Sequence, residues 1–208
     1  MEQRTAAWYA ARLGKATASR IADIVARTKS GYSTSRANYA AQLVCERLTG
    51  VQAEAFVSSA MAWGVEKEPE AQRLYEFEHD VEVLKMGFID HPSIVMSGAS
   101  PDGLVGDVGL IEVKCPLTAT HIDTLMGRSV PGRYVTQMQW QMAVTGRQWC
   151  DFVSYDPRLP LHLRLFVSRV HRDVAVIADL EQEVAAFLAE VDATLAKLDG
   201  LASQAEAA

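Results

Sequence analysis

Ser100-Pro101-Asp102-Gly103-Leu104, followed by Leu110-Ile111-Glu112-Val113-Lys114, is the part of the chain that predicts its fold. Pro-Asp-Gly is typical of a turn, because Pro presets φ and Gly accepts a positive φ. The glycines at 106 and 109 predict a second turn between the two stretches. We therefore expect a β-hairpin whose second strand ends at Lys114.

This hairpin would gather the side chains needed for phosphodiester hydrolysis. Because side chains alternate across a strand, Glu112 and Lys114 share one face. Asp102 and Glu112 can hold a divalent cation such as Mg²⁺, since hard cations bind carboxylate oxygens, water and phosphate. Lys114 can position or activate the attacking water, and as a base it would need a lowered pKa. Taken alone, the same residues also fit a solvated hairpin with a cross-strand ion pair.

Composition predicts one soluble α/β domain over residues 1–208. The chain has 208 residues, 49% of them hydrophobic, which suits a single compact core. No apolar run approaches the roughly 20 residues of a membrane-spanning helix, and the first residues lack a signal-peptide pattern. Cys45, Cys115 and Cys150 lack the spacing of a disulfide framework or metal site. We expect a cytoplasmic protein with buried, reduced thiols and no membrane contact.

Charge is unevenly distributed, although the formal net charge is -6. Residues 173–208 hold eight acids and one lysine, whereas residues 1–36 hold seven Lys/Arg and two acids. A local basic surface can bind phosphates even on an acidic protein. We expect such a basic surface to bind phosphates, and the acidic C-terminal segment to face outward, because it would repel the bound phosphates.

The hydrophobic periodicity predicts a mixed β-sheet flanked by helices. Residues 173–198 have apolar positions three and four apart and predict an acidic amphipathic helix, with residues 199–208 as a disordered tail. Helices are also predicted over 6–14, 36–49, 59–78 and 133–145, with another starting near Thr17 and Ser19. A polar loop is predicted over 28–35, and strands over 81–84, 87–90, 94–97, 149–155 and 161–170.

A phosphate site is one interpretation of the segment from Arg12 to Ser19. A helix beginning at Thr17 or Ser19 would present free N–H groups to an anion, and Arg12 would add charge. Simple capping of the helix is the alternative. Gln137 and Gln141 share one helix face, where they could contact phosphate or form polar surface.

Three glutamates could add a ligand to the hairpin or hold a metal-bound water. Glu66, Glu68 and Glu70 lie at the predicted start of one helix, where acids also favour the helix dipole. The spacing alone does not choose among them.

The order of these motifs resembles the YqaJ-type viral recombinases, the lambda exonuclease-like branch of the PD-(D/E)xK nucleases. The resemblance covers about residues 3 to 195. Its motifs are Trp8, Arg12-Leu13-Gly14, Thr17-Ala18-Ser19, Ala62-Trp63-Gly64 with Glu68, Ser100-Pro101-Asp102-Gly103, Glu112-Val113-Lys114-Cys115-Pro116, Tyr134 with Gln137-Met138-Gln139, and Tyr155-Asp156-Pro157-Arg158.

The resemblance implies a PD-(D/E)xK core and a role for each matching residue. Asp102, Glu112 and the backbone carbonyl of Val113 match the metal ligands, Lys114 the catalytic lysine and Glu68 the helix glutamate. The positions that hold a DNA 5′-phosphate match Arg12, Ser19, Ser100 and Gln137, with Thr17 nearby. Position 141 departs from the wider group, which often has tyrosine there.

The resemblance also implies an activity. Family members degrade the 5′-ended strand of linear double-stranded DNA to mononucleotides and leave a 3′ single strand. The expected cofactor is Mg²⁺, with Mn²⁺ as a substitute. The expected partners are DNA with a 5′-phosphate, a single-strand annealing protein, and two further copies of the chain in a ring-shaped homotrimer. An endonuclease on the same core and a non-catalytic DNA-binding recombination subunit are the alternatives.

Overall fold

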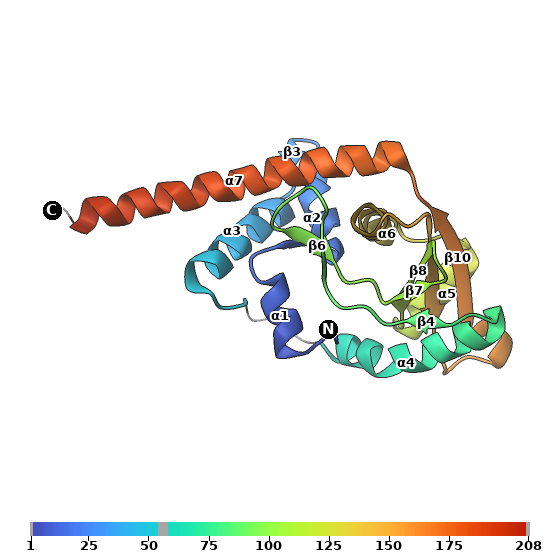
Figure 1. Cartoon of the computed structure of the whole chain (residues 1–208). Helices are drawn as coiled ribbons and strands as arrows, with labels where there is room; N and C mark the ends of the chain where they lie inside the picture. The colour runs from blue at the N-terminus through green and yellow to red at the C-terminus, as the bar shows by residue number, and fades with distance from the viewer. Residues whose placement is uncertain (1, 54–57, 207–208) are drawn as a thin grey trace.

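The structure, a computed structural model, describes residues 2–53 and 58–206 (Figure 1). Its centre is a five-stranded sheet with the order β10-β9-β8-β7-β4. The pair β8–β9 is parallel and the other neighbours are antiparallel, which confirms the predicted mixed sheet. The strands are β4 (Val83–Leu84), β7 (Gly103–Val105), β8 (Gly109–Lys114), β9 (Trp149–Tyr155) and β10 (Leu165–His171).

The predicted hairpin is confirmed as β7 and β8. Its register pairs Gly103 with Ile111 and Val105 with Gly109. Gly106 has a φ of 50° in the turn, a backbone conformation that glycine adopts without steric cost. On its other side β8 pairs with β9, so Glu112 and Lys114 lie on the central strand of the sheet.

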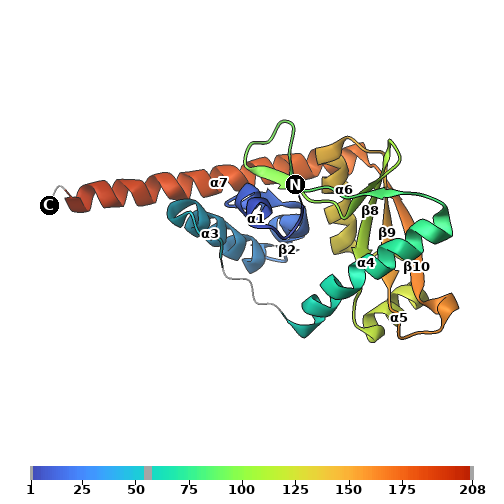
Figure 2. The same ribbon diagram turned by 60° about the horizontal axis from the view of Figure 1, so that its bottom comes forward.

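Helices cover both faces of this sheet (Figure 2). α4 (Ser59–His79) packs on one face, where its buried side chains meet those of four strands; the cluster includes Ala71, Tyr75, Ile111, Val113 and Val153. α6 (Gly132–Thr145) packs on the other face; that cluster includes Met138, Met142, Leu110 and Phe152. Because side chains alternate along β8, Glu112 lies on the α6 face with Leu110.

A second layer contains the N-terminal elements. It holds α1 (Ala6–Arg12), β1 (Ala16–Thr17), η1 (Ala18–Arg20), α2 (Ile21–Val25), the hairpin β2 (Arg27–Thr28) and β3 (Gly31–Tyr32), and α3 (Thr34–Thr49). β1 joins a small sheet in the order β1-β6-β5, with β5 (Ile89–Asp90) and β6 (Ser97–Ala99). The layer's core includes Ile21, Ile24, Leu43, Val184 and Phe187.

α7 (Val174–Glu206) runs along α3 and extends past the rest of the molecule (Figure 1). Several of its acids face the N-terminal arginines instead of pointing away from them. The ion pairs join Glu183 to Arg27, Glu190 to Arg36 and Asp192 to Arg47, each with a closest N–O distance of 2.6 to 2.7 Å. α7 therefore neutralises part of the basic charge of the N-terminal elements, and the orientation of its acids relative to a bound phosphate stays a prediction.

The C-terminal boundary differs from the prediction. The predicted disordered tail at 199–208 is wrong up to Glu206, because α7 continues through that residue. Residues 207–208 lie outside the part of the chain that the structure describes. Helix propensity explains the extension, since alanine and leucine dominate the sequence after Lys197.

Other boundaries moved where turns interrupt an apolar run. The predicted strand at 94–97 is wrong for its first part, because Met96 has a φ of 62° and β6 begins only at Ser97. Residues Leu161–Leu163 form the 3-10 helix η2, so β10 starts at Leu165. α5 (Thr118–Gly127) was not predicted, and the loop predicted at 28–35 contains β2 and β3.

Two further sequence expectations can be compared with the described residues. Cys115 and Cys150 are buried as predicted, whereas Cys45 is exposed. Within residues 2–53 and 58–206, we find no helix with the length and hydrophobicity needed to cross a bilayer.

Candidate active site

Two carboxylates lie together beside the end of β8. Glu112 is buried, with 1% of its surface exposed, and Asp102 comes from the turn before β7. The backbone N–H of Val113 donates to Oδ2 of Asp102 at 2.7 Å, which ties this turn to β8. Burial, followed by the charge of Glu112, raises the pKa of Asp102 to about 8. Without a cation, this spot therefore disfavours a second negative charge beside Glu112.

This donor set fits a divalent cation. Hard cations bind carboxylate and carbonyl oxygens, and Asp102, Glu112 and the carbonyl of Val113 supply them. Across residues 2–53 and 58–206, no group of three or more His, Cys, Asp or Glu side chains has metal-binding geometry. Asp102 and Glu112 would therefore be the two acidic ligands, and the Val113 carbonyl, water and substrate would fill the remaining coordination positions of the cation.

Glu68 lies near this pair but has a different partner. Its charge helps to raise the pKa of Asp102, which places it close to the carboxylates. Its Oε2 is 2.5 Å from Nη2 of Arg4, a pairing that the sequence analysis did not anticipate. Glu68 also lines a cavity of about 490 Å³ together with Val113 and Lys114. It is positioned to contact water or substrate at the site.

The carboxylate of Glu112 receives hydrogen bonds from three side chains. Nζ of Lys114 and Nε2 of Gln137 both donate to Oε1, the second at 2.7 Å. Nε2 of Gln141 donates to Oε2 at 2.6 Å. The sequence predicted Gln137 and Gln141 on one helix face, as phosphate contacts or polar surface, and the polar-surface interpretation is wrong for Gln141, which is fully buried. Their shared partner, Glu112, lies on β8 and is brought to them by the packing of α6 against that strand.

Lys114 is held as an ammonium group. Burial lowers its pKa, but the carboxylates of Glu112 and Asp102 outweigh that effect and raise the pKa above its ordinary value. The lowered pKa expected for a general base is therefore not found in this state of the protein. A charged Lys114 is suited to donating hydrogen bonds to a phosphate oxygen or to a water molecule.

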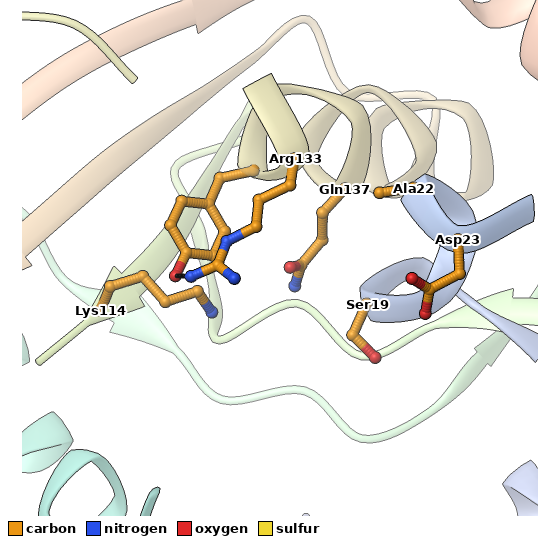
Figure 3. Close-up of a pocket in the computed structure, with 7 residues that line it drawn as sticks. Ser19, Ala22, Asp23, Lys114, Arg133 and Gln137 are labelled. Carbon is orange, nitrogen blue, oxygen red and sulfur yellow. Dashed lines mark hydrogen bonds between the residues drawn. The ribbon is translucent and has the colours of Figure 1, made fainter. Parts of the chain in front are cut away.

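An open cavity of about 410 Å³ adjoins Lys114 (Figure 3). Gln137 and Arg133 reach into it from α6, while Ser19 and Asp23 come from the opposite N-terminal layer. Its lining residues are Ser19, Ala22, Asp23, Lys114, Arg133, Tyr134 and Gln137. Two cations and three neutral hydrogen-bonding side chains suit a phosphate group, and Asp23 is paired with Arg20 at 2.6 Å.

Arg12 and Ser100 contact each other next to this region. Nη1 of Arg12 is 3.3 Å from Oγ of Ser100, and the Arg12 guanidinium lies 4.1 Å from the ring centre of Trp8. Burial lowers the pKa of Arg12, although an arginine remains charged at neutral pH. Among the described side chains, Arg12 makes no ion pair with a carboxylate. Its charge is available to a ligand.

The predicted helix N-terminus at Thr17 and Ser19 is wrong. Thr17 ends the short strand β1 and is buried, and Ser19 lies in the 3-10 helix η1. α2 begins only at Ile21 and has five residues. Thr17, extended where it pairs with β6, is the N-cap residue of η1, but its side chain makes no capping hydrogen bond. Ser19 nevertheless lines the cavity, so it could contact a phosphate through its side-chain hydroxyl and not through a helix N-terminus.

The comparisons with known proteins identify the family of the chain. The profile of the YqaJ-like viral recombinase domain matches residues 7–148. The crystal structure of an alkaline exonuclease (LHK-Exo) from Laribacter hongkongensis is 53% identical, with a TM-score of 0.90 over 96% of this chain and 99% of that one. LHK-Exo in complex with dAMP gives the same identity and coverage, with a TM-score of 0.91.

A more distant structure shows the fold alone. The phage related exonuclease from Haemophilus somnus 129PT is 17% identical, with a TM-score of 0.73 over 88% of this chain and 96% of that one. No curated protein sequence matches the chain. The profile match and the 53% identity together show that this chain belongs to the YqaJ-like viral recombinase family of nucleases, the family that its motifs resemble.

Proposed function

We propose that this protein is a Mg²⁺-dependent 5′→3′ exonuclease that degrades one strand of linear double-stranded DNA to mononucleotides. The observation that carries the proposal is the meeting of two carboxylates, a lysine and an open polar cavity at the end of β8. A structural hairpin would have no need for two adjacent acids, one with a strongly raised pKa, beside such a cavity.

The cation would be held by Asp102, Glu112 and the carbonyl of Val113. Such a cation lowers the pKa of water and stabilises the charge that develops on the scissile phosphate. Mn²⁺ is the expected substitute. Lys114, as an ammonium group, would leave Glu112 and donate hydrogen bonds to the attacking water or to a phosphate oxygen. Glu68 would orient water from the other side of the site.

The polarity of degradation would come from the recognition of the DNA end. Arg12, Ser19, Ser100 and Gln137 offer charge and hydrogen bonds to a terminal 5′-phosphate, and Thr17 supports the strand that precedes Ser19. Phosphate dianions bind arginine and neutral donors well because these hydrogen bonds are charge-assisted. A 5′-hydroxyl end would lack that anchor and would be degraded more slowly.

The biological setting is part of the same proposal. The 3′ single strand left behind would be taken over by a single-strand annealing protein, and the enzyme would work as a ring-shaped homotrimer around its DNA. We expect it to act in the cytoplasm of a bacterial host. The support for these points is membership of the recombinase family.

Strand-specific degradation tests the proposal. A linear duplex with one 5′-phosphate and one 5′-hydroxyl end would be incubated with the protein in Mg²⁺, beside a nick-free circle. Selective loss of the 5′-phosphorylated strand with an intact circle is the expected result. Cleavage of the circle would instead identify an endonuclease, and the absence of Mg²⁺-dependent cleavage would identify a binding subunit.

A further inference from the structure

Gln141 is the most enclosed partner of the candidate metal ligand Glu112. Its exposed surface is 0%, and it lies on α6 one turn after Gln137. Its Nε2 donates to Oε2 of Glu112 at 2.6 Å, and no cavity near the site is lined by it. A DNA phosphate therefore has no route to this amide, and its role must be exercised through Glu112.

The other end of the same amide is also held in place. The thiol of Cys150, on β9, lies 3.9 Å from Oε1 of Gln141 and can donate its proton to that oxygen. Cys150 is fully buried, and burial raises its pKa well above the ordinary value, so it remains a thiol. With its oxygen directed at a donor, the amide presents its N–H group to the carboxylate of Glu112.

The two oxygens of Glu112 consequently have different surroundings. Oε1 receives Lys114 and Gln137, both of which line the open cavity and can turn toward a ligand. Oε2 receives Gln141, which is enclosed by protein. Partners that line a cavity can be exchanged when DNA binds, whereas a buried one cannot move without leaving a polar group unpaired.

We infer that Gln141 is a positioning residue that anchors Oε2 of Glu112, leaving Oε1 for a divalent cation while Lys114 and Gln137 transfer to water and phosphate. The inference deepens the proposed function and rests on it, because it concerns the same cation site. It also separates two glutamines that the sequence pattern treats alike. Gln141 orients the cation ligand Glu112, whereas Gln137 binds the terminal phosphate of the DNA.

The variants Gln141→Met and Gln137→Met test this division. Partners that orient metal ligands typically contribute about 10- to 100-fold to affinity or activity. We expect Gln141→Met to weaken Mn²⁺ binding by at least about 10-fold in calorimetric titrations without DNA. The Mn²⁺ concentration needed for half-maximal cleavage should rise by the same factor. Gln137→Met should bind Mn²⁺ nearly as the unaltered protein does and lose discrimination between 5′-phosphate and 5′-hydroxyl ends.

Gln139→Met is the matched control. Gln139 lies on the same helix and is 3% exposed, but its amide bonds the carbonyl of His171 and the N–H of Asp173, away from the site. Its replacement should lower thermal stability and leave Mn²⁺ affinity unchanged. Gln141→Asn is a second variant that keeps an amide in the core but shortens it by a methylene, and it should also lose Mn²⁺ affinity.

The outcomes separate the two levels of inference. Folded Gln141→Met and Gln141→Asn proteins that bind Mn²⁺ as tightly as the unaltered protein would overturn the anchoring role and leave the proposed function intact. An equal loss of Mn²⁺ affinity in Gln139→Met would also overturn it, because the effect would then be general loosening of α6. An unaltered protein that neither binds Mn²⁺ nor cleaves DNA would instead overturn the proposed function.

Discussion

The indole nitrogen of Trp8 donates a hydrogen bond to the hydroxyl oxygen of Ser100, at a distance of 2.9 Å. This contact joins α1 to the segment that precedes Asp102, and the same indole ring lies beneath the guanidinium of Arg12. One aromatic side chain thus orients two groups that we assign to the 5′-phosphate. The first helix is thereby attached to the turn that carries a candidate metal ligand.

Trp8→Leu should therefore weaken recognition of the DNA end without preventing cleavage. The change removes one hydrogen bond and one cation–π contact, which together correspond to about 10-fold in discrimination. The ratio of kcat/KM for 5′-phosphate and 5′-hydroxyl ends measures it. Arg12→Ala should reduce the same ratio, and the double variant should lose less than the sum of both losses because the residues act together. An unchanged ratio in both variants would place the anchor elsewhere.

Asp102→Ala and Lys114→Ala should abolish cleavage while the protein remains folded. The first removes a cation ligand, and the second removes the ammonium group that would engage water or phosphate. Losses of about 1000-fold or more in single-turnover cleavage are expected when groups of one catalytic unit are removed. Circular dichroism verifies the fold of each variant. A purified Asp102→Ala protein with full activity would contradict the site assignment.

His91 should make the stability of the protein sensitive to mild acid. Its Nδ1 accepts hydrogen bonds from the backbone N–H groups of Ser93 and Ile94, and only the unprotonated nitrogen can do so. Burial lowers the pKa of His91, while Glu181 opposes that shift. The unfolded chain takes up the proton more readily, so stability is complete above the ordinary histidine range and decreases as the pH falls through it.

His91→Asn should remove this dependence, because an asparagine oxygen can accept the same backbone hydrogen bonds and does not titrate. Between about pH 7.5 and about pH 5.5, the melting temperature of the unaltered protein should fall by several degrees more than that of the variant. Thermal unfolding in EDTA provides the comparison. Parallel curves for the two proteins would show that His91 does not carry the acid sensitivity.

A polar cluster around the buried Asp151 should stabilise the sheet edge away from the active site. Asp151 accepts a hydrogen bond from the Tyr75 hydroxyl at 2.7 Å and pairs with Arg169 at 2.7 and 2.8 Å. Arg169→Met leaves the buried carboxylate with Tyr75 alone, and because the Arg169 side chain is 45% exposed the cost should be about 2 kcal/mol of unfolding free energy. Tyr75→Phe removes one donor and should cost about 1 kcal/mol.

Urea unfolding measures both losses, and cleavage per folded molecule should be unchanged in each variant because the cluster lies on the α4 face of the sheet. A larger loss for Tyr75→Phe than for Arg169→Met would mean that Asp151 is mainly paired with Tyr75.

The sequence by itself determined the elements whose pattern is local. The hairpin was predicted from the Pro-Asp-Gly turn and the two glycines. The alternation along 110–114 predicted that Glu112 and Lys114 share one strand face and lie near Asp102. Turn chemistry and strand alternation act over a few residues, so they can be recognised without the rest of the chain. The family motifs added the roles that local patterns left open, including the choice of Glu68.

Only the tertiary structure decided which side chains share a partner. Gln141 and Glu112 are 29 residues apart, and Arg4 and Glu68 are 64 apart, so no local pattern pairs them. Near Ser19 the chain forms the 3-10 helix η1 after the β1–β6 pairing, and the α-helix α2 begins only at Ile21. The raised pKa of Lys114 likewise depends on the carboxylates of Glu112 and Asp102, which packing places beside it. Such contacts arise when separate elements bury their apolar faces together, and they exist only once the chain has folded.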